Sequence, residues 1–433
     1  MEIPEMREIA IEMLMAGVKG ADPEKLVEDS ISIEDNVLKV KDETFELDSY
    51  DKILLFGIGK SSVPMAKPFS ELEIDDGLII TNKKHMDAGD LNVEVRSGTH
   101  PLPSEENIRH SKEIYDKISS AQNSIIIFLV SGGGSSLYTL PHDDIELKDI
   151  IELNEMMLES GANVSEINTV RKHLSKVKGG RSADLCSDGN QIISLIISDV
   201  VGDELTDVAS GPTVADPSTY GDAVAVIKRY DLWDKVSESI RVHLSMGKSG
   251  EIEETPKRVE ANNFLVGSNM IALQKVKAVA ESKNLTNWLL TSENQGIATE
   301  VAKPLASIAV EIQKSGNPIK TPAALIIGGE MTVEMKKKMD TELKGGPNRE
   351  FVLSFAQEIR GRDIVVASID TDGVDGVGKS GAIADGMTIY RSSLNAEKAL
   401  NEHQTEIFFD ELGDSIEFES NTNVNDISVV IVS

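Results

Sequence analysis

Apolar, strand-like runs alternate along this chain with helical stretches and glycine-rich turns. The runs between residues 52 and 370 are KILLFGIG, DGLIITN, NSIIIFLVSGGG, QIISLIISD, NNFLVGSN, WLLTS, PAALIIGGE and DIVVASID. Such an alternation favours parallel βαβ units, and therefore an α/β fold. The runs lead into Gly, Ser, Asn or Asp at their carboxyl ends, which is where open α/β sheets bind ligands. We therefore expect functional residues in the turns that follow the strands.

The segments between the strands include helices and one long loop. Apolar residues return every three to four positions in Glu146–Glu159, Glu166–Val177 and Met270–Glu281, and Gly179–Gly180 should end the second of these helices. Asp203–Pro217 has no such period and contains two prolines, so we predict a long ordered loop there.

A chain of 433 residues is long enough for two or three domains. The polar, charged stretch at Gly247–Arg258 has the composition of a linker. We therefore predict one domain at residues 1–255 and a second at 256–433.

Charge and composition limit the classes of function. Lys and Arg number 43 against 73 Asp and Glu, and a net charge of -30 opposes general binding to nucleic acid. Cys186 is the only cysteine, which excludes an intramolecular disulfide and fits a reducing cytoplasm. The longest apolar run, Ile125–Val130, is far shorter than the ~20 residues that cross a bilayer. We predict a soluble cytoplasmic protein that binds neither membrane nor nucleic acid.

Two glycine-rich turns follow apolar strands and suit an anion. In LLFGIGKSS, Leu54 stands where a P-loop needs glycine, but the turn keeps free backbone N–H groups and Lys60, a point charge for phosphate or carboxylate. An ordinary turn with a solvated lysine explains this segment equally well. The turn SGGGSS favours phosphate or substrate binding more strongly, because three consecutive glycines cost more backbone entropy than a structural turn needs.

Positive charge gathers in one segment of this acidic chain. Residues 167–183 contain no acidic residue. The basic residues in this window are Arg171, Lys172, Lys176, Lys178 and Arg181. On a helix Lys172 and Lys176 would share a face and form the basic island that an anionic ligand requires. The alternative is a basic surface helix paired with acidic neighbours.

Aspartates at strand ends are candidate magnesium ligands, because Mg²⁺ prefers one or two carboxylates together with nucleotide phosphates. They are Asp199, Asp203, Asp370, Asp372 and Asp375. Asp-Gly pairs also simply form turns, so for any one aspartate the turn is as good an explanation.

A second Gly-Gly turn, GGPNREF, brings Arg349 to a helix start, where it would either clamp an anion or pair with a neighbouring acid. Gly-x-Ser-x-Gly is absent, and His100 in GTHPLPSEEN has no partner by spacing, so hydrolase chemistry is not favoured.

The chain resembles the glycerate 2-kinase family from about Lys52 to Asp385. The strings that carry the resemblance occur in family order: GIGKSS, GTHPLPSEEN, SGGGSS, INTVRKHLSKVKGGR, ISDVVGDELTDVASGPTVADP, GSN, GGEMTV, GGPNREF and DTDGVDG. The resemblance implies a Rossmann-like three-layer α/β/α N-terminal domain and a smaller C-terminal α/β domain containing the MOFRL region, at about 322–433, with the active site in a cleft between them.

The resemblance also implies an activity: ATP-dependent phosphorylation of the 2-hydroxyl of D-glycerate, giving 2-phosphoglycerate and ADP, with Mg²⁺. Lys60 matches the family's active-site lysine, and Asp199 lies in the family's SDVxGD string. Many members read GGRNQE where this chain has Pro347 at the arginine position, with Arg349 two residues later.

We therefore predict a site with three roles. The predicted catalytic residues are Lys60, Asp199 and Arg349. The predicted substrate- and nucleotide-binding residues are Ser131, Gly132, Gly133, Gly134, Ser135, Ser136, Asn168, Arg171, Lys172, Lys176, Arg181 and Asn348. The predicted metal ligands are Asp199 and Asp372. The predicted small-molecule ligands are D-glycerate and ATP, and a homodimer is a possible oligomeric state.

The alternative enzyme class is an NAD(P)H-dependent hydroxypyruvate reductase. Gly57-x-Gly59 is half of a dinucleotide fingerprint, but Ser62 stands where the third glycine or alanine is expected. His100 would then be the general acid. A sensor that binds ligand without turnover is a third class, but the sequence has no recognisable DNA-binding module.

Overall fold

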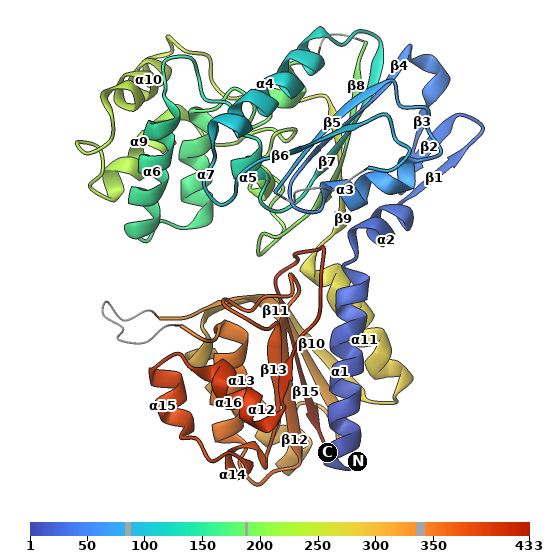
Figure 1. The fold of residues 1–433 in the computed structure, drawn as a ribbon, viewed down its shortest axis with the longest axis vertical. Helices are drawn as coiled ribbons and strands as arrows, with labels where there is room; N and C mark the ends of the chain where they lie inside the picture. The colour runs from blue at the N-terminus through green and yellow to red at the C-terminus, as the bar shows by residue number, and fades with distance from the viewer. Residues whose placement is uncertain (83–87, 187–188, 335–342) are drawn as a thin grey trace. The chain divides into compact units, whose positions relative to one another are not determined.

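The computed structural model describes residues 1–82, 88–186, 189–334 and 343–433. The chain divides into two compact units (Figure 1). The 23–266 unit comprises Pro23–Ser198 and Asp203–Val266. The C-terminal unit comprises Met1–Asp22, Asp199–Gly202 and Gly267–Ser433.

A six-stranded sheet organises the 23–266 unit. Its strand order is β6 (Glu94–Ser97), β5 (Asp76–Thr81), β4 (Lys52–Ile58), β7 (Ser124–Val130), β8 (Gln191–Ile197) and β9 (Ala261–Gly267). The pairs from β6 to β8 are parallel. Every residue of β7 is buried, which explains its unbroken apolar sequence, since a parallel sheet covered on both faces has no solvent side.

The strand order reverses between β4 and β7. From β4 the chain continues outward through β5 to β6, whereas β7, β8 and β9 follow on the other side. Ile58 and Val130, the last residues of β4 and β7, are register partners. The turns after these two strands therefore leave the sheet side by side at a topological switch point, where open α/β sheets bind ligands.

Helices cover this sheet and form a second core beside it. The helices α3 (Ser62–Ala66) and α4 (Glu105–Ser120) pack on the sheet. The second core lies among α6 (Leu147–Glu159), α7 (Val164–His173), α9 (Tyr220–Arg229) and α10 (Glu238–Ser249). The unit also contains the short helices α2 (Pro23–Glu28), α5 (Gly134–Leu137) and α8 (Arg181–Asp184), and an antiparallel sheet of β1 (Ile31–Glu34), β2 (Val37–Val40) and β3 (Glu43–Glu46).

The C-terminal unit has a mixed six-stranded sheet. Its order is β10 (Thr286–Ile297), β11 (Ala323–Thr332), β15 (Asp426–Val432), β12 (Ile364–Asp370), β13 (Gly381–Asp385) and β14 (Ser415–Ile416). The pair β10 and β11 is parallel, and the other pairs are antiparallel.

Two pairs of helices pack on this sheet, α1 (Ile3–Gly20) with α11 (Asn269–Ser282) and α12 (Ala298–Ser315) with α13 (Pro347–Glu358). The unit also contains three shorter helices, α14 (Thr388–Arg391), α15 (Ala396–Asn401) and α16 (Thr405–Leu412).

The predicted α/β class is confirmed, and the structure differs from the sequence-based expectations in three places. The runs that became β11 and β12 are antiparallel to β15, because the C-terminal strand inserts between them. The two units separate at Val266 rather than near residue 255. The helix α1 belongs to the C-terminal unit, because its apolar face, including Met6 and Met13, packs on α11 and the sheet.

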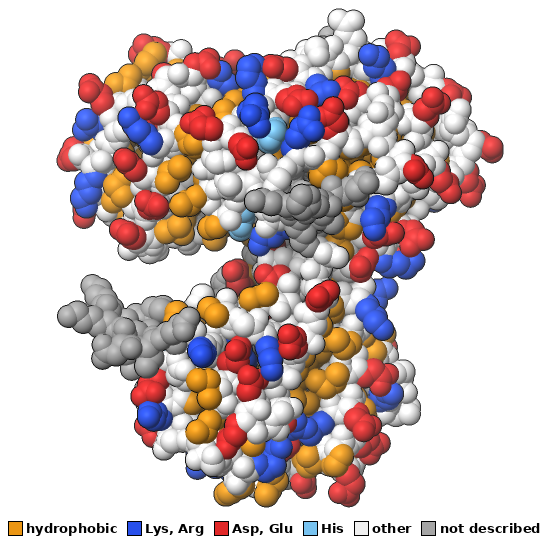
Figure 2. All heavy atoms as spheres, in the orientation of Figure 1, with side chains coloured by type: hydrophobic (Ala, Val, Ile, Leu, Met, Phe, Trp, Pro, Cys, Tyr) orange, Lys and Arg blue, Asp and Glu red, His pale blue; other side chains and the backbone are white. Residues whose placement is uncertain are grey.

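Among the residues that the structure describes, no helix is both long and apolar enough to cross a bilayer. Figure 2 shows acidic side chains over much of the visible face of each unit, as the net charge of -30 leads one to expect.

Candidate functional site

The two glycine-rich turns are joined to each other at the switch point. The backbone N–H of Lys60 donates to the carbonyl of Gly132 over 2.9 Å. The N–H of Ser61 donates to Oγ of Ser131 over 3.1 Å. A Cβ on Gly59, which has a φ of +120°, would lie 2.3 Å from that same Oγ. Glycine is therefore required here both by conformation and by the closeness of the second turn.

The SGGGSS turn presents unpaired backbone donors. The N–H of Ser131 donates to the carbonyl of Ile58, and the N–H of Gly134 donates to the carbonyl of Ser131. In contrast, no acceptor within the described parts of the chain takes the N–H groups of Gly132, Gly133 or Ser135. Successive N–H groups of this kind, around a left-handed residue, form an anion-binding concavity. Gly133 is that residue, with a φ of +81°.

The side chains of Lys60 and His100 meet over Gly133. A Cβ on Gly133 would lie 3.0 Å from Cδ2 of His100 and 3.3 Å from Cγ of Lys60. The two side chains therefore flank the space above the glycine turn. Burial, and then the positive charge of Lys60, lower the pKa of His100 to about 4. The imidazole is thus neutral at physiological pH.

A buried chain of polar side chains supports the glycine turn from below. Oγ of Ser135 lies 2.8 Å from Oγ of Ser210, which donates to Oδ1 of Asn168 over 2.8 Å. Nδ2 of Asn168 in turn donates to Asp207. Asn168 is therefore a support for the turn, and its amide is fully engaged within the protein.

The loop that carries Ser210 has an unusual backbone. Ala209, Ser210 and Gly211 all have positive φ, at 51°, 61° and 58°. Left-handed residues other than glycine cost about 1–2 kcal/mol each. Hydrogen bonds from the N–H groups of Gly179 and Gly180 to the carbonyls of Ser210 and Gly211, at 3.0 and 2.7 Å, hold this conformation. Non-glycine residues strained in this way cluster at functional sites.

The basic segment is largely internal rather than a surface island. The helix α7 ends at His173, because Ser175 pairs with Pro141 and the N–H of Lys176 donates to the carbonyl of Leu140. The prediction that Lys172 and Lys176 share a helical face is therefore wrong.

Each of these lysines has an acidic partner instead. The ammonium of Lys172 is buried 3.4 Å from Asp216 and 3.8 Å from Asp207, and Lys176 pairs with Asp143 at 2.5 Å. The acidic partners of the alternative interpretation are therefore present, but its surface helix is not, because Lys172 is buried and Lys176 lies beyond the end of α7.

Arg171 and Arg181 differ in their free donors. Nε of Arg171 donates to Asn154 over 2.7 Å, while its terminal nitrogens have no hydrogen-bond partner in the described parts of the chain. Burial lowers the pKa of Arg171 to about 10. Nη2 of Arg181 donates to the carbonyl of Glu253 over 3.2 Å. Arg171 is thus the better placed of the two to bind an anion.

The structure assigns Arg349 to the interior of the C-terminal unit, contrary to its predicted role as an anion clamp. Its side chain is fully buried. Nε donates to Asp375 over 3.0 Å, Nη1 pairs with Glu406, and Nη2 donates to the carbonyls of Asp375 and Val377. Each of the three nitrogens has a partner and the side chain is buried, so Arg349 is not placed to clamp a ligand.

Asn348 is likewise buried, and its Nδ2 donates to Asp375 and Asp426. Its side chain is therefore also unavailable for the predicted binding role. Pro347, at the position of the family's arginine, begins α13 and is partly exposed.

Acidic residues gather where β11 and β12 end and β15 begins. Asp426 faces both Gly329 and Asp370 across the sheet. Burial is the main cause that raises the pKa of Asp426, to about 8, and that of Asp370. Burial, and then the charge of Asp199, raise the pKa of Glu330. Asn425 donates to the backbone carbonyl of Asp199 over 2.9 Å.

The predicted metal ligands Asp199 and Asp372 therefore both lie at this end of the C-terminal sheet. Asp372 follows Asp370, to which its N–H donates over 3.0 Å. Within the described ranges no group of three His, Cys, Asp or Glu is arranged to hold a metal ion. Carboxylates in smaller number fit Mg²⁺, which fills its remaining positions with water and phosphate oxygens.

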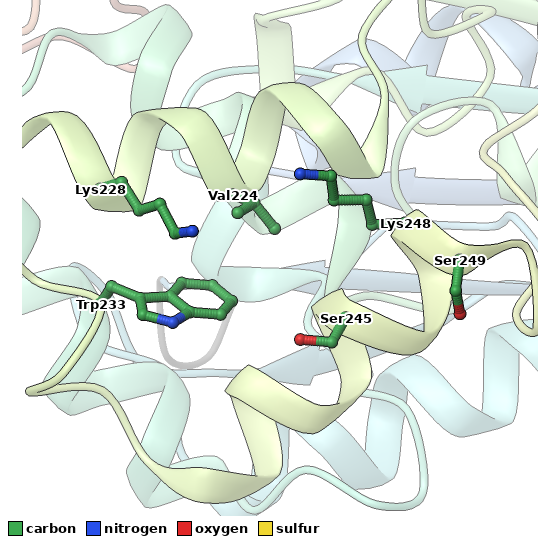
Figure 3. A pocket seen from close by; sticks show the side chains of 6 residues that line it. All are labelled: Val224, Lys228, Trp233, Ser245, Lys248 and Ser249. Carbon is green, nitrogen blue, oxygen red and sulfur yellow. The ribbon is translucent and has the colours of Figure 1, made fainter.

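A separate surface pocket of about 390 Å³ lies between α9 and α10 (Figure 3). Its lining residues are Val224, Lys228, Trp233, Ser245, Lys248 and Ser249. The ammonium of Lys228 lies 5.0 Å from the ring centroid of Trp233. None of the predicted site residues lines this pocket.

Two groups of site residues were missed from the sequence. Lys178, noted only as part of the basic segment, donates from Nζ to the carbonyls of Ser135 and Tyr138. The strained Ala209–Gly211 turn lies in the string VASGPT, whose glycine and proline signalled a loop but not its conformation.

Comparisons with known proteins cover nearly the whole chain. Residues 9–245 match a domain family of unknown function (DUF4147), and residues 323–426 match the MOFRL family. A glycerate 2-kinase of Pyrococcus horikoshii is 37% identical over 99% of this chain and 98% of its own length. A D-glycerate 2-kinase of Thermotoga maritima is 32% identical over 99% of this chain and 98% of its own length.

The solved structures agree with these matches. The crystal structure of a glycerate kinase of Thermotoga maritima has a TM-score of 0.86 and 30% identity, covering 99% of this chain and all of that one.

Proposed function

This chain belongs to the glycerate 2-kinase family, and from that premise we propose that it transfers the γ-phosphoryl group of ATP to the 2-hydroxyl of D-glycerate. The products are 2-phosphoglycerate and ADP. The observation that carries the proposal is the meeting of the Lys60 turn and the SGGGSS turn at the switch point, with three backbone donors free in the described chain.

Phosphoryl transfer requires positioning and positive charge more than covalent chemistry from the protein. Lys60 supplies a cation beside the glycine turn, and the N–H groups of Gly132, Gly133 and Ser135 supply fixed partial charges. Donors fixed in advance cost no reorganisation as negative charge develops. We therefore assign the phosphate groups to this turn, with Lys60 next to the migrating phosphoryl group.

Arg171 is the proposed clamp for the glycerate carboxylate. Its terminal nitrogens are unpaired in the described chain, and its charge is close enough to help lower the pKa of Lys178, which is bonded to the glycine turn. A guanidinium holds a carboxylate through two parallel hydrogen bonds.

Asp199 and Asp372 are the proposed magnesium ligands. Mg²⁺ would supply positive charge to the phosphate oxygens of ATP. Burial and neighbouring carboxylates raise the pKa values of Asp370 and Asp426 at this end of the sheet, and a divalent cation would relieve that repulsion.

A reducing cytoplasm is the proposed compartment, because the chain has one cysteine and it is unpaired.

The reductase alternative has less support. A dinucleotide-binding turn needs glycine or alanine at its third position for close packing of helix on strand. Ser62 occupies that position, and its buried Oγ donates to the carbonyl of Gly59 over 2.8 Å.

The test is an assay of purified protein with ATP, Mg²⁺ and D-glycerate that resolves 2-phosphoglycerate from 3-phosphoglycerate. A parallel reaction contains NADH and hydroxypyruvate. Formation of 2-phosphoglycerate without oxidation of NADH supports the proposal. Oxidation of NADH with ATP untouched would replace it by the reductase, and formation of 3-phosphoglycerate would overturn its regiochemistry.

A further inference from the structure

His100 reaches the switch point from an edge strand. It follows β6, two strands away from β4 in the sheet. The buried side chain of Asn107 holds the loop there, because Oδ1 accepts from the N–H of Thr99 over 2.9 Å and Nδ2 donates to the carbonyl of Ser136 over 2.8 Å. The loop that carries His100 is thus tied directly to the SGGGSS turn.

The imidazole of His100 makes no polar contact within the described parts of the fold. Neither ring nitrogen has a hydrogen bond or ion pair with the residues described here, in contrast to His173 and His243, which bond Glu254 and Asp144. The residue is exposed, yet its ring packs beside Gly133 and Lys60. An imidazole whose ring nitrogens have no partner in the described chain, beside the turn proposed to bind phosphate, is available to contact substrate.

The surroundings of His100 couple its basicity to ligand binding. Lys60 is the charged group that faces the ring from the β4 turn, and residues 131–136 contribute none. In the free protein the ring is therefore a weak base. Anionic phosphates and carboxylate next to Lys60 have the opposite effect, because negative charge stabilises the imidazolium. Binding of substrate thus makes His100 a stronger base.

We propose that His100 is the general base that accepts the proton of the glycerate 2-hydroxyl. This inference rests on the proposed kinase function. The hydroxyl oxygen forms a bond to the γ-phosphorus, and the bond from that phosphorus to the β,γ-bridging oxygen breaks. The electron pair of that bond leaves with ADP. The hydroxyl proton passes to a ring nitrogen of His100 and then to solvent.

The test compares His100→Gln and His100→Ala with wild type and with His110→Gln. Glutamine keeps hydrogen-bonding capacity but cannot take up the proton. His110 lies on α4, outside the glycine turns, and serves as the matched control. We expect His100→Gln to lower kcat by about 10²-fold or more, with a nearly unchanged KM and Tm. His110→Gln should keep the wild-type kcat.

Two readouts separate a base from a merely structural residue. In the pH profile of kcat, the fall on the acidic side that the wild type shows should disappear in His100→Gln. Added imidazole should partly restore the kcat of His100→Ala. An acidic limb retained in the variant, kcat within threefold of wild type, or a loss confined to KM would overturn the assignment and leave Asp199 as the candidate base.

Absence of any 2-phosphoglycerate with the wild-type protein would overturn the proposed function, and this inference with it. An active wild type with an unaffected His100→Gln would overturn the inference alone.

Discussion

The ammonium of Lys178 is buried and donates to the carbonyl oxygens of Ser135 and Tyr138 over 2.7 and 2.6 Å. Burial, and to a lesser extent Arg171, lower the pKa of Lys178 well below its usual value. The short helix α5 between these carbonyls continues the SGGGSS turn. Lys178 therefore positions the turn from inside the protein instead of binding substrate.

Replacing Lys178 with methionine should loosen the glycine turn. Methionine keeps the length and apolar stem but leaves the buried carbonyl of Tyr138 without a donor, at about 1–3 kcal/mol, while the carbonyl of Ser135 keeps the hydroxyl of Thr139. We expect a lower Tm and a raised KM for ATP, measured by thermal unfolding and initial rates. Lys112→Met, which removes an exposed pair with Asp116, is the control and should change neither. An unaltered KM for ATP in Lys178→Met would contradict the positioning role.

Replacing Lys60 with alanine should reduce turnover without unfolding the protein. The side chain of Lys60 lies beside Gly133 in the glycine turn, and loss of one preorganised electrostatic group typically costs about 10²–10³ in kcat. Initial rates with saturating ATP and glycerate measure the effect. Lys67→Ala, which removes an exposed pair with Glu24, should keep wild-type kcat. Near-normal turnover by Lys60→Ala would remove Lys60 from the mechanism.

Arg349→Met should instead destabilise the C-terminal unit. It leaves the fully buried Asp375 without its cationic partner, and breaking a buried ion pair costs about 3–5 kcal/mol. The free energy of unfolding, from urea titration, is the measurement. Arg109→Met, which removes an exposed pair with Glu106, should change it by less than about 0.5 kcal/mol. A stable Arg349→Met protein with low kcat would restore the role predicted from sequence.

The difference between Lys60 and Arg349 shows what a sequence pattern can predict. The position of Lys60 follows from local facts, because a buried strand followed by Gly-x-Gly must place the next residue at the carboxyl edge of a sheet. The direction of Arg349 depends on Asp375 and Glu406, which are distant in sequence. A charged residue at a helix start looks the same in sequence whether it faces ligand or core.

Other departures also come from contacts between distant segments. The helical period continues to Val177, but pairing of Ser175 with Pro141 ends the helix α7 at His173. The N-terminal helix has an apolar face in sequence, yet only the packing of Gly17 against Val276 and Ile427 shows which unit it covers. Periodicity predicts the elements, while their partners depend on the complete fold.

Acid should destabilise the 23–266 unit through His142. Its ring lies 4.5 Å from that of His243, and its buried Nε2 has no partner in the described chain. Burial, and then His243, lower the pKa of His142 to about 3, whereas an unfolded histidine has a pKa of about 6.5. Below pH 6.5 the unfolded chain therefore binds a proton that the folded protein does not. Stability from this residue is complete above pH 6.5 and falls continuously towards pH 3.

His142→Phe should remove this contribution, because phenylalanine keeps a ring against His243 but does not titrate. The free energy of unfolding of wild type should fall between pH 7 and pH 5 by about 1–2 kcal/mol more than that of the variant, since one unit of pKa shift corresponds to about 1.4 kcal/mol. Urea titrations at pH 7, 6 and 5 measure both slopes, and the values at pH 7, where the wild-type ring is neutral, give the effect of the substitution itself. Equal slopes for the two proteins would show that His142 takes up its proton in the folded state, and that its burial against His243 does not make the fold sensitive to acid.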